Sequence, residues 1–146
     1  MELKFQVQAK ILRPRNEVFD AVYNPQKLSG YFTTGGSSGP LVAGSTVTWD
    51  FADFPGAFPV HVREVVPNRL IVLQWKAADG EYDTTVRMEF EALDERSTLI
   101  RISESGWKET QKGLESSYGN CMGWTQMLCC LKVYAEQGKN LREFFF

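Results

Sequence analysis

The sequence predicts an α+β fold in which a curved antiparallel sheet wraps around one long C-terminal helix. Three observations carry this prediction: a period of two along most of residues 3–103, two short helical segments near residues 14–28, and an apolar helical period over residues 118–137. Turn signals of the hairpin type join most of the strands, so we expect about six or seven antiparallel strands. Only the last helix is long enough to cover their apolar face.

The first hundred residues justify these elements in order. Residues 3–11 alternate strictly between apolar and polar side chains, which is typical of a half-buried strand. Pro14 suits a first helical turn, and apolar residues follow at helical spacing until Asn24-Pro25 stops the run. A second short helix is expected around Leu28. The glycine-rich segment from Thr33 to Gly44 indicates a loop or an irregular edge strand.

The middle of the chain returns to the period of two. We predict strands at residues 45–51, 58–66, 70–75, 82–92 and 98–103. Residues 54–57 indicate a turn or a bulged loop. Pro67-Asn68 and Asp79-Gly80 are turn signals that join neighbouring strands into hairpins.

The final helix has one broad apolar arc. At about 100° per residue, the arc gathers Cys121, Trp124, Met127, Leu128, Leu131, Tyr134 and Ala135. A polar strip of Thr125, Lys132 and Glu136 lies beside it. A curved sheet covered by a single helix tends to leave a concave space, and we expect the functional site in that space.

Composition narrows the classes of function. The 146 residues suit a single domain spanning 1–146, with 43% hydrophobic and 23% charged residues. The net charge of −2 and the interleaved charges argue against nucleic acid and against anionic lipid surfaces as partners. No apolar run approaches the roughly 20 residues that insert into a bilayer, so a cytoplasmic location is expected. His61 is the only histidine and no C-x-x-C occurs, so we predict neither a metal nor a cofactor.

Four stretches of the chain resemble a known family. They are residues 13–25, residues 66–75, Ser105-Gly106-Trp107, and Gly123-Trp124 with Leu128 and Leu131 after it. Their order and spacing resemble the homologues of the activator of the 90-kDa heat-shock protein ATPase, within the START-like (SRPBCC) superfamily. The resemblance implies a helix-grip fold that is seldom filled completely. The sequence departs from it at Tyr31-Phe32, where many members carry tryptophan, so the rim of the cavity is expected to differ.

We predict a ligand cavity from residues of inward parity and from the helix arc. Its predicted lining is Phe19, Phe32, Trp49, Phe51, Val62, Glu64, Trp75, Tyr82, Thr84, Met88, Trp107, Cys121, Trp124 and Leu128. Tyr82 and Thr84 would orient a ligand by hydrogen bonding. Regular pleating would point Glu64 inward, whereas a bulge would bring it to water. The alternative for the aromatic residues is an ordinary core, and Cys121 is better explained as a small core residue than as a nucleophile.

These observations favour a protein that binds an apolar or amphipathic small molecule, such as a lipid or a polyketide. One alternative is a cyclase-like or hydrolase-like enzyme, which would need His61, Glu64 and Tyr82 to converge; we assign no catalytic residue. The resemblance suggests a third function, that of a co-chaperone or other protein-interaction module. Whether the protein is a monomer or a homodimer stays open. The Phe144–Phe146 tail is expected to dock on its own domain or on a neighbouring molecule, or else to be disordered.

Overall fold

One antiparallel sheet and one long helix form the framework of the molecule. The computed structural model describes residues 1–145. Its elements are β1 (Lys4–Ile11), α1 (Arg15–Tyr23), α2 (Pro25–Leu28), β2 (Gly36–Ser37), β3 (Thr46–Phe51), β4 (Phe54–Val66), β5 (Leu70–Lys76), β6 (Asp83–Asp94), β7 (Ser97–Ser105), α3 (Gln111–Gln137) and the 3₁₀ helix η1 (Leu141–Phe144). Within the described chain the strands are ordered β1-β7-β6-β5-β4-β3-β2, and each neighbouring pair is antiparallel. The predicted α+β helix-grip architecture is therefore confirmed.

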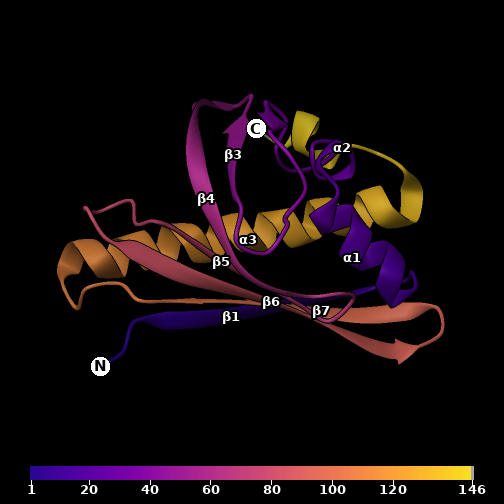
Figure 1. The fold of residues 1–146 in the computed structure, drawn as a ribbon, viewed down its shortest axis with the longest axis horizontal. Coiled ribbons are helices and arrows are strands. Elements are labelled where there is room, and N and C mark those ends of the chain that lie inside the picture. The colour runs from indigo at the N-terminus through magenta and orange to yellow at the C-terminus, as the bar shows by residue number, and fades with distance from the viewer. Residues whose placement is uncertain (146) are drawn as a thin grey trace.

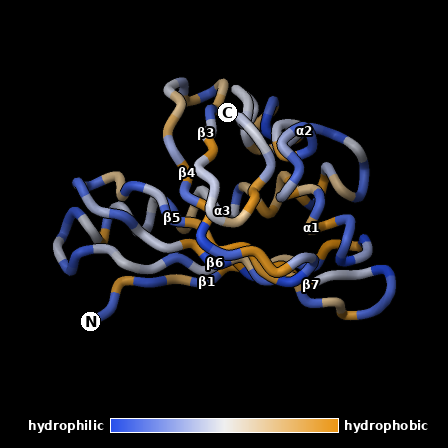
Figure 2. Tube along the Cα trace, in the orientation of Figure 1, coloured by the Kyte–Doolittle hydropathy of each residue, from blue (hydrophilic) through white to orange (hydrophobic). Residues whose placement is uncertain are grey.

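Helix α3 runs along one face of this sheet, while β3 and β4 rise beside it and α1 and α2 cover the neighbouring corner (Figure 1). Apolar residues concentrate along β6, β7 and the parts of α3 near them (Figure 2). The core between these layers includes the fully buried Trp49, Ile100, Ile102, Met127 and Leu131. Among residues 1–145, no helix is both long and apolar enough to cross a bilayer.

The period of two places strand residues as expected, but several boundaries differ. β4 begins at Phe54, so residues 54–57 do not form a separate turn. A register shift opposite Trp49–Phe51 makes them an irregular part of the strand, which fits the bulged alternative. Phe51 pairs with Phe54, and the chain reverses through the two residues between them. Asp50 Oδ1 accepts a hydrogen bond of 3.0 Å from the Gly56 amide, which stabilises this irregular start of β4. β7 also continues to Ser105, beyond the predicted end at residue 103.

Helix α3 begins at Gln111 and not at residue 118. The side chain of Thr110 caps it, because Thr110 Oγ1 accepts a hydrogen bond of 3.0 Å from the Gly113 amide. The first turns are mostly polar, so they lack the apolar period on which the prediction depended. Gly138 ends the helix in the left-handed conformation at φ 69°, where glycine has no side chain to clash.

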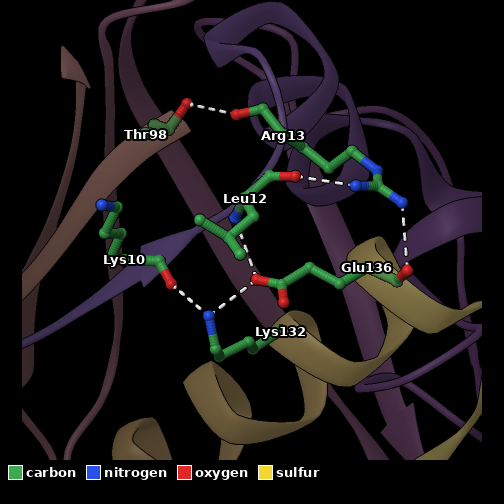
Figure 3. A network of polar contacts seen from close by, with 6 residues as sticks. All are labelled: Lys10, Leu12, Arg13, Thr98, Lys132 and Glu136. Carbon is green, nitrogen blue, oxygen red and sulfur yellow. Dashed lines mark hydrogen bonds and ion pairs between the residues drawn. The ribbon is translucent and has the colours of Figure 1, made fainter. Parts of the chain in front are cut away.

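A polar network joins the end of α3 to the end of β1 (Figure 3). Glu136 Oε2 accepts hydrogen bonds of 2.9 Å from the Leu12 amide and 2.7 Å from Lys132 Nζ. Lys132 Nζ also donates to the Lys10 carbonyl oxygen at 2.7 Å. Arg13 Nη2 donates to the Glu136 carbonyl oxygen at 3.0 Å. These bonds fasten the helix to the sheet at the end remote from its N-terminus.

Glu136→Gln should make stability less sensitive to acid. Partial burial opposes ionisation of Glu136, but the bonds from Lys132 and Leu12 and the nearby positive charges outweigh it and hold the pKa of this carboxyl below its usual range. The carboxylate therefore stabilises the folded state above its unfolded pKa, and this contribution disappears as pH falls through the folded pKa. Urea denaturation at neutral pH should show a loss of about 1–2 kcal/mol in the variant.

That difference between the parent and Glu136→Gln should shrink as the pH is lowered below the usual carboxyl range. Glu89→Gln is the matched control, because Glu89 pairs with Arg87 and its side chain is 43% exposed. This control should change stability by no more than about 0.5 kcal/mol. A difference for Glu136→Gln that is constant from neutral to strongly acidic pH would contradict the role given to its charge.

The C-terminal segment folds back over β3 and β4. In η1, Arg142 Nη2 lies 3.0 Å from both carboxylate oxygens of Asp53, in the turn between these strands. Its guanidinium carbon lies 4.8 Å from the ring centroid of Phe51. Phe144 is 84% exposed, and Phe146 lies outside the described residues. The η1 segment thus docks on the protein through Arg142, whereas Phe144, the first residue of the predicted tail, is largely exposed.

Candidate functional site

A pocket of about 820 Å³ lies between the sheet, the middle of α3 and η1. Within residues 1–145, its aromatic lining consists of Phe32, Phe51, Phe54, Phe58, Trp75 and Trp124. They come from the segment after α2, from β3, β4 and β5, and from α3. The period of two places Phe51, Phe58 and Trp75 on the inward face of their strands, so the sheet supplies much of the aromatic wall. Phe54 lies at the irregular start of β4 and is 75% exposed.

The wall that α3 contributes to the pocket has two positions without side chains. Gly119 and Gly123 both line it, and they lie on the same face of α3 because they are four residues apart. A Cβ atom built at either glycine would meet no atom within 4 Å. The absence of side chains at these two positions therefore leaves part of the pocket open.

The aromatic rings hold one another in fixed orientations. The ring centroids of Trp75 and Trp124 are 5.3 Å apart, and those of Phe32 and Trp124 are 5.6 Å apart. Phe32 also meets Phe51 edge to face at 4.9 Å. Pairs of this kind contribute about 0.5–1.5 kcal/mol each beyond the area they bury. The wall is therefore formed before any ligand arrives.

Both indoles of this wall donate to a single buried carboxylate, that of Glu104 in β7. Trp75 Nε1 donates to Glu104 Oε2 at 2.9 Å, and Trp124 Nε1 donates to Oε1 at 2.8 Å. Thr84 Oγ1 donates to Oε2 at 2.7 Å, and Asn120 Nδ2 lies 2.9 Å and 3.2 Å from the two oxygens. Glu104 thus joins β5, β6, β7 and α3 behind the pocket.

The surroundings of Glu104 supply hydrogen-bond donors to both of its oxygens. An indole N–H can only donate, and a carboxylate offers about four acceptor positions, which the four donors fill. Glu104 is 1% exposed, and no lysine, arginine or histidine among residues 1–145 forms an ion pair with it. A buried carboxyl group without an ionic partner depends on its hydrogen bonds. Because two of these bonds come from the indoles of Trp75 and Trp124, they also fix the positions of both rings.

Sequence reasoning missed Glu104 and Asn120. Thr98, Ile100 and Ile102 point inward from β7, and the same parity reaches Glu104 once the strand is extended by two residues. Asn120 lies one helical turn before Trp124 and therefore shares its face. Both signals were present in the pattern, but the predicted end of the strand hid the first of them.

Of the predicted cavity residues, Phe32, Phe51, Trp75 and Trp124 line the pocket. The others that are buried in the surrounding core are Phe19, Trp49, Val62, Met88 and Leu128. Thr84 lies behind the wall on Glu104. Trp107 packs on Phe5 at 5.7 Å. Cys121 is half-buried and is not part of the lining.

Three polar residues considered for a ligand or a reaction lie elsewhere. Glu64 is exposed, because a β-bulge between Val62 and Glu64 turns it away from the face that regular pleating would give it. Tyr82 donates to Asp79 at 2.7 Å, and partial burial followed by this bond raises its pKa. His61 is half-buried, with Nδ1 2.9 Å from Thr46 Oγ1. None of Glu64, Tyr82 and His61 lines the pocket.

Tyr31 and Phe32, next to each other at the rim, have different surroundings. Tyr31 is fully buried, its hydroxyl donates to the Ala21 carbonyl oxygen at 3.0 Å, and its ring lies 5.0 Å from that of Tyr134. Burial, and then the neighbouring Tyr134, raise the pKa of Tyr31 well above its ordinary value. Phe32 then faces the pocket. One residue of the pair thus anchors the segment, and the other shapes the opening.

Comparison with solved structures shows the fold in other proteins. The protein SSP2350 from Staphylococcus saprophyticus has a TM-score of 0.81 at 26% identity, over 95% of this chain and 96% of its own. The Aha1 dimer from Colwellia psychrerythraea has a TM-score of 0.77 at 24% identity, over 94% of this chain and 98% of its own. DynU16, from the dynemicin biosynthetic locus, has a TM-score of 0.81 at 23% identity over 95% of this chain. This chain spans 49% of DynU16.

Comparison with curated proteins found no match. The sequence profile of the family described as Activator of Hsp90 ATPase homolog 1-like protein matches residues 13–136. This match covers most of the chain and includes the stretches that suggested the resemblance. The chain therefore belongs to the Activator of Hsp90 ATPase homolog 1-like protein family.

Proposed function

We propose that this protein binds an apolar or amphipathic small molecule in the pocket between the sheet and α3. The observation that carries the proposal is the pocket of about 820 Å³ with a preformed aromatic wall. Ligand pockets typically measure about 300–1,000 Å³, with mostly apolar walls and a few polar groups. Asn120 and Gln126 supply uncharged polar groups in the lining.

Apolar contact would supply most of the affinity. Burying about 200 Å² of apolar ligand surface is worth about 5 kcal/mol before the cost of ordering the ligand. The tryptophan faces suit flat rings, because their own N–H groups are already bonded to Glu104. We favour binding over catalysis, since His61, Glu64 and Tyr82 do not converge at the pocket.

Gly123→Leu should weaken ligand binding strongly while leaving the fold intact. The new side chain would enter the open space next to the glycine, and leucine is a better helix former than glycine by roughly 0.5–1 kcal/mol. In a thermal-shift screen of lipids, polyketides and phenols, a ligand at a hundred times its dissociation constant should raise the parent melting temperature by about 5–10 °C. The same ligand should bind the variant at least about tenfold more weakly.

Cys129→Leu is the matched control, because Cys129 lies on the same helix, is exposed and is not part of the lining. It should bind every ligand as the parent does. A second measurement is the NMR chemical shift of the indole N–H groups of Trp75 and Trp124, which should change when a ligand binds. A broad screen with no thermal shift and no change in these signals would refute the proposal, as would unchanged binding by Gly123→Leu.

A protein partner is the second candidate, favoured by family membership and by the dimeric Aha1 neighbour. The partner would be the 90-kDa chaperone or a second copy of this chain. Analytical ultracentrifugation of the protein alone and with the chaperone distinguishes these two cases. Binding of a partner is compatible with an occupied pocket, so the two proposals are tested separately.

A further inference from the structure

We propose that the ligand is an apolar organic acid, with its apolar body on the tryptophan wall and its acidic group at the mouth beside Lys76 and Arg142. This inference rests on the proposed function and names the class of ligand. It depends on how the charges around the pocket are distributed. Three features of that distribution point the same way.

Among the described residues, Lys76 and Arg142 are the charged residues that contribute to the pocket lining, and both are cations. No aspartate or glutamate belongs to the lining formed by the described residues. The protein as a whole is acidic, with a net charge of −2. A purely cationic lining is therefore a local feature and does not follow from composition.

Glu104 does not reverse this preference. Its four donors occupy the carboxylate, and its 1% exposure keeps it from contact with a ligand. It also occupies the N–H groups of Trp75 and Trp124, so these two rings offer no free donor to an acidic group. The acid of the ligand therefore fits better at the mouth.

Lys76 supplies the exchangeable cation. Its ion pair with Glu81 is solvent-exposed, at 55% for Lys76 and 87% for Glu81. Exposed pairs of this kind contribute little to stability. Lys76 can therefore turn from Glu81 to a ligand carboxylate at little cost. Lys76 ends β5 and is part of the pocket lining, so its flexible side chain starts from the edge of the pocket.

Arg142 supplies a fixed cation on the other side. Asp53 engages its Nε and Nη2 atoms at 3.0–3.2 Å, and its side chain is only 12% exposed. Phe51 and Phe32 lie 4.8 Å and 5.8 Å from the guanidinium carbon. Because Asp53 balances the charge of Arg142, Lys76 provides the net positive charge, while Arg142 provides a rigid planar donor surface.

Three probes with one apolar body test this inference: 1-pyrenebutanoate, 1-pyrenebutanol and 1-pyrenebutylammonium. Fluorescence titration of the full chain should rank the acid first, the alcohol second and the ammonium last. Acid and alcohol should differ by about three- to tenfold, and added salt should reduce this difference. Gly123→Leu should weaken all three probes, which places them in the pocket.

Lys76→Gln is the diagnostic variant. It should weaken the acid about three- to tenfold and leave the alcohol within about twofold of the parent. Lys27→Gln is the matched control, because Lys27 also forms an exposed ion pair, with Asp20, and is not part of the lining. It should change neither probe.

Two outcomes would overturn the inference, and they differ in what else they overturn. Equal affinities for the three probes, or equal effects of Lys76→Gln on acid and alcohol, would refute the acidic ligand and leave small-molecule binding in place. No binding of any probe, with unchanged indole signals of Trp75 and Trp124, would count against both proposals.

Discussion

Glu104→Ala should lower the free energy of unfolding by about 3–6 kcal/mol, because a buried donor that loses its acceptor costs about 1–3 kcal/mol. The truncation removes the acceptor of two indole N–H groups, of the Thr84 hydroxyl and of the Asn120 amide. Water can reach some of these donors through the pocket, which limits the sum. Urea denaturation followed by circular dichroism measures the loss.

Glu104→Gln keeps the prediction testable if the alanine variant does not fold. Glutamine preserves the side-chain volume, but its N–H₂ group would face groups that are themselves donors. We therefore expect a smaller loss of unfolding free energy, about 2–4 kcal/mol. The indole signals of Trp75 and Trp124 should move in this variant. Glu91→Ala is the control, since Glu91 forms an ion pair with Arg101 and is 51% exposed. A loss below about 1 kcal/mol for both Glu104 variants would show that the carboxylate does not hold the wall.

Trp124→Ala should cost about 3–5 kcal/mol, the usual effect of truncating a buried large aromatic residue. Trp124 is 2% exposed and contacts the rings of Phe32 and Trp75. The substitution also enlarges the pocket. For ligands with a bulky apolar body, the loss of binding free energy should therefore be smaller than the loss of unfolding free energy. Thermal and urea unfolding measure the first effect, and ligand titration measures the second.

Trp124→Phe separates packing from hydrogen bonding, because phenylalanine keeps a ring but cannot donate to Glu104. It should cost less than the alanine substitution. Met122→Ala is the control on the same helix, at 62% exposure, and should change stability by no more than about 0.5 kcal/mol. Equal losses for Trp124→Ala and Met122→Ala would contradict the placement of Trp124 in the wall.

Much of the fold was predictable from periodicity. Alternation over residues 3–11 and 82–92 predicts β1 and β6 nearly to their ends, and Asn24-Pro25 predicts the boundary between α1 and α2. The start of α3 was not predictable in this way, because its first turns carry a cap and polar residues and no apolar face. The early start of β4 depends on the pairing of Phe51 with Phe54, a contact that local pattern does not specify.

The site was predictable only in part, for a different reason. Parity tells which side chains point inward, but it does not tell which of them meet other side chains and which meet open space. Trp49 and Trp75 both point inward, yet Trp49 is packed in the core and Trp75 lines the pocket. The depth of the pocket is set by Gly119 and Gly123 on the opposite helix. That information lies in the pairing of distant segments.

The two sides of the pocket divide the tasks of folding and recognition between different residues. Glu104 and the tryptophans bonded to it hold the framework together. A side chain added at Gly119 or Gly123 would begin in open space, because a Cβ atom there meets no atom within 4 Å. Substitutions at these two positions can therefore change the shape of the pocket while the fold is kept. The same separation makes them the first positions for engineering a receptor with a new selectivity.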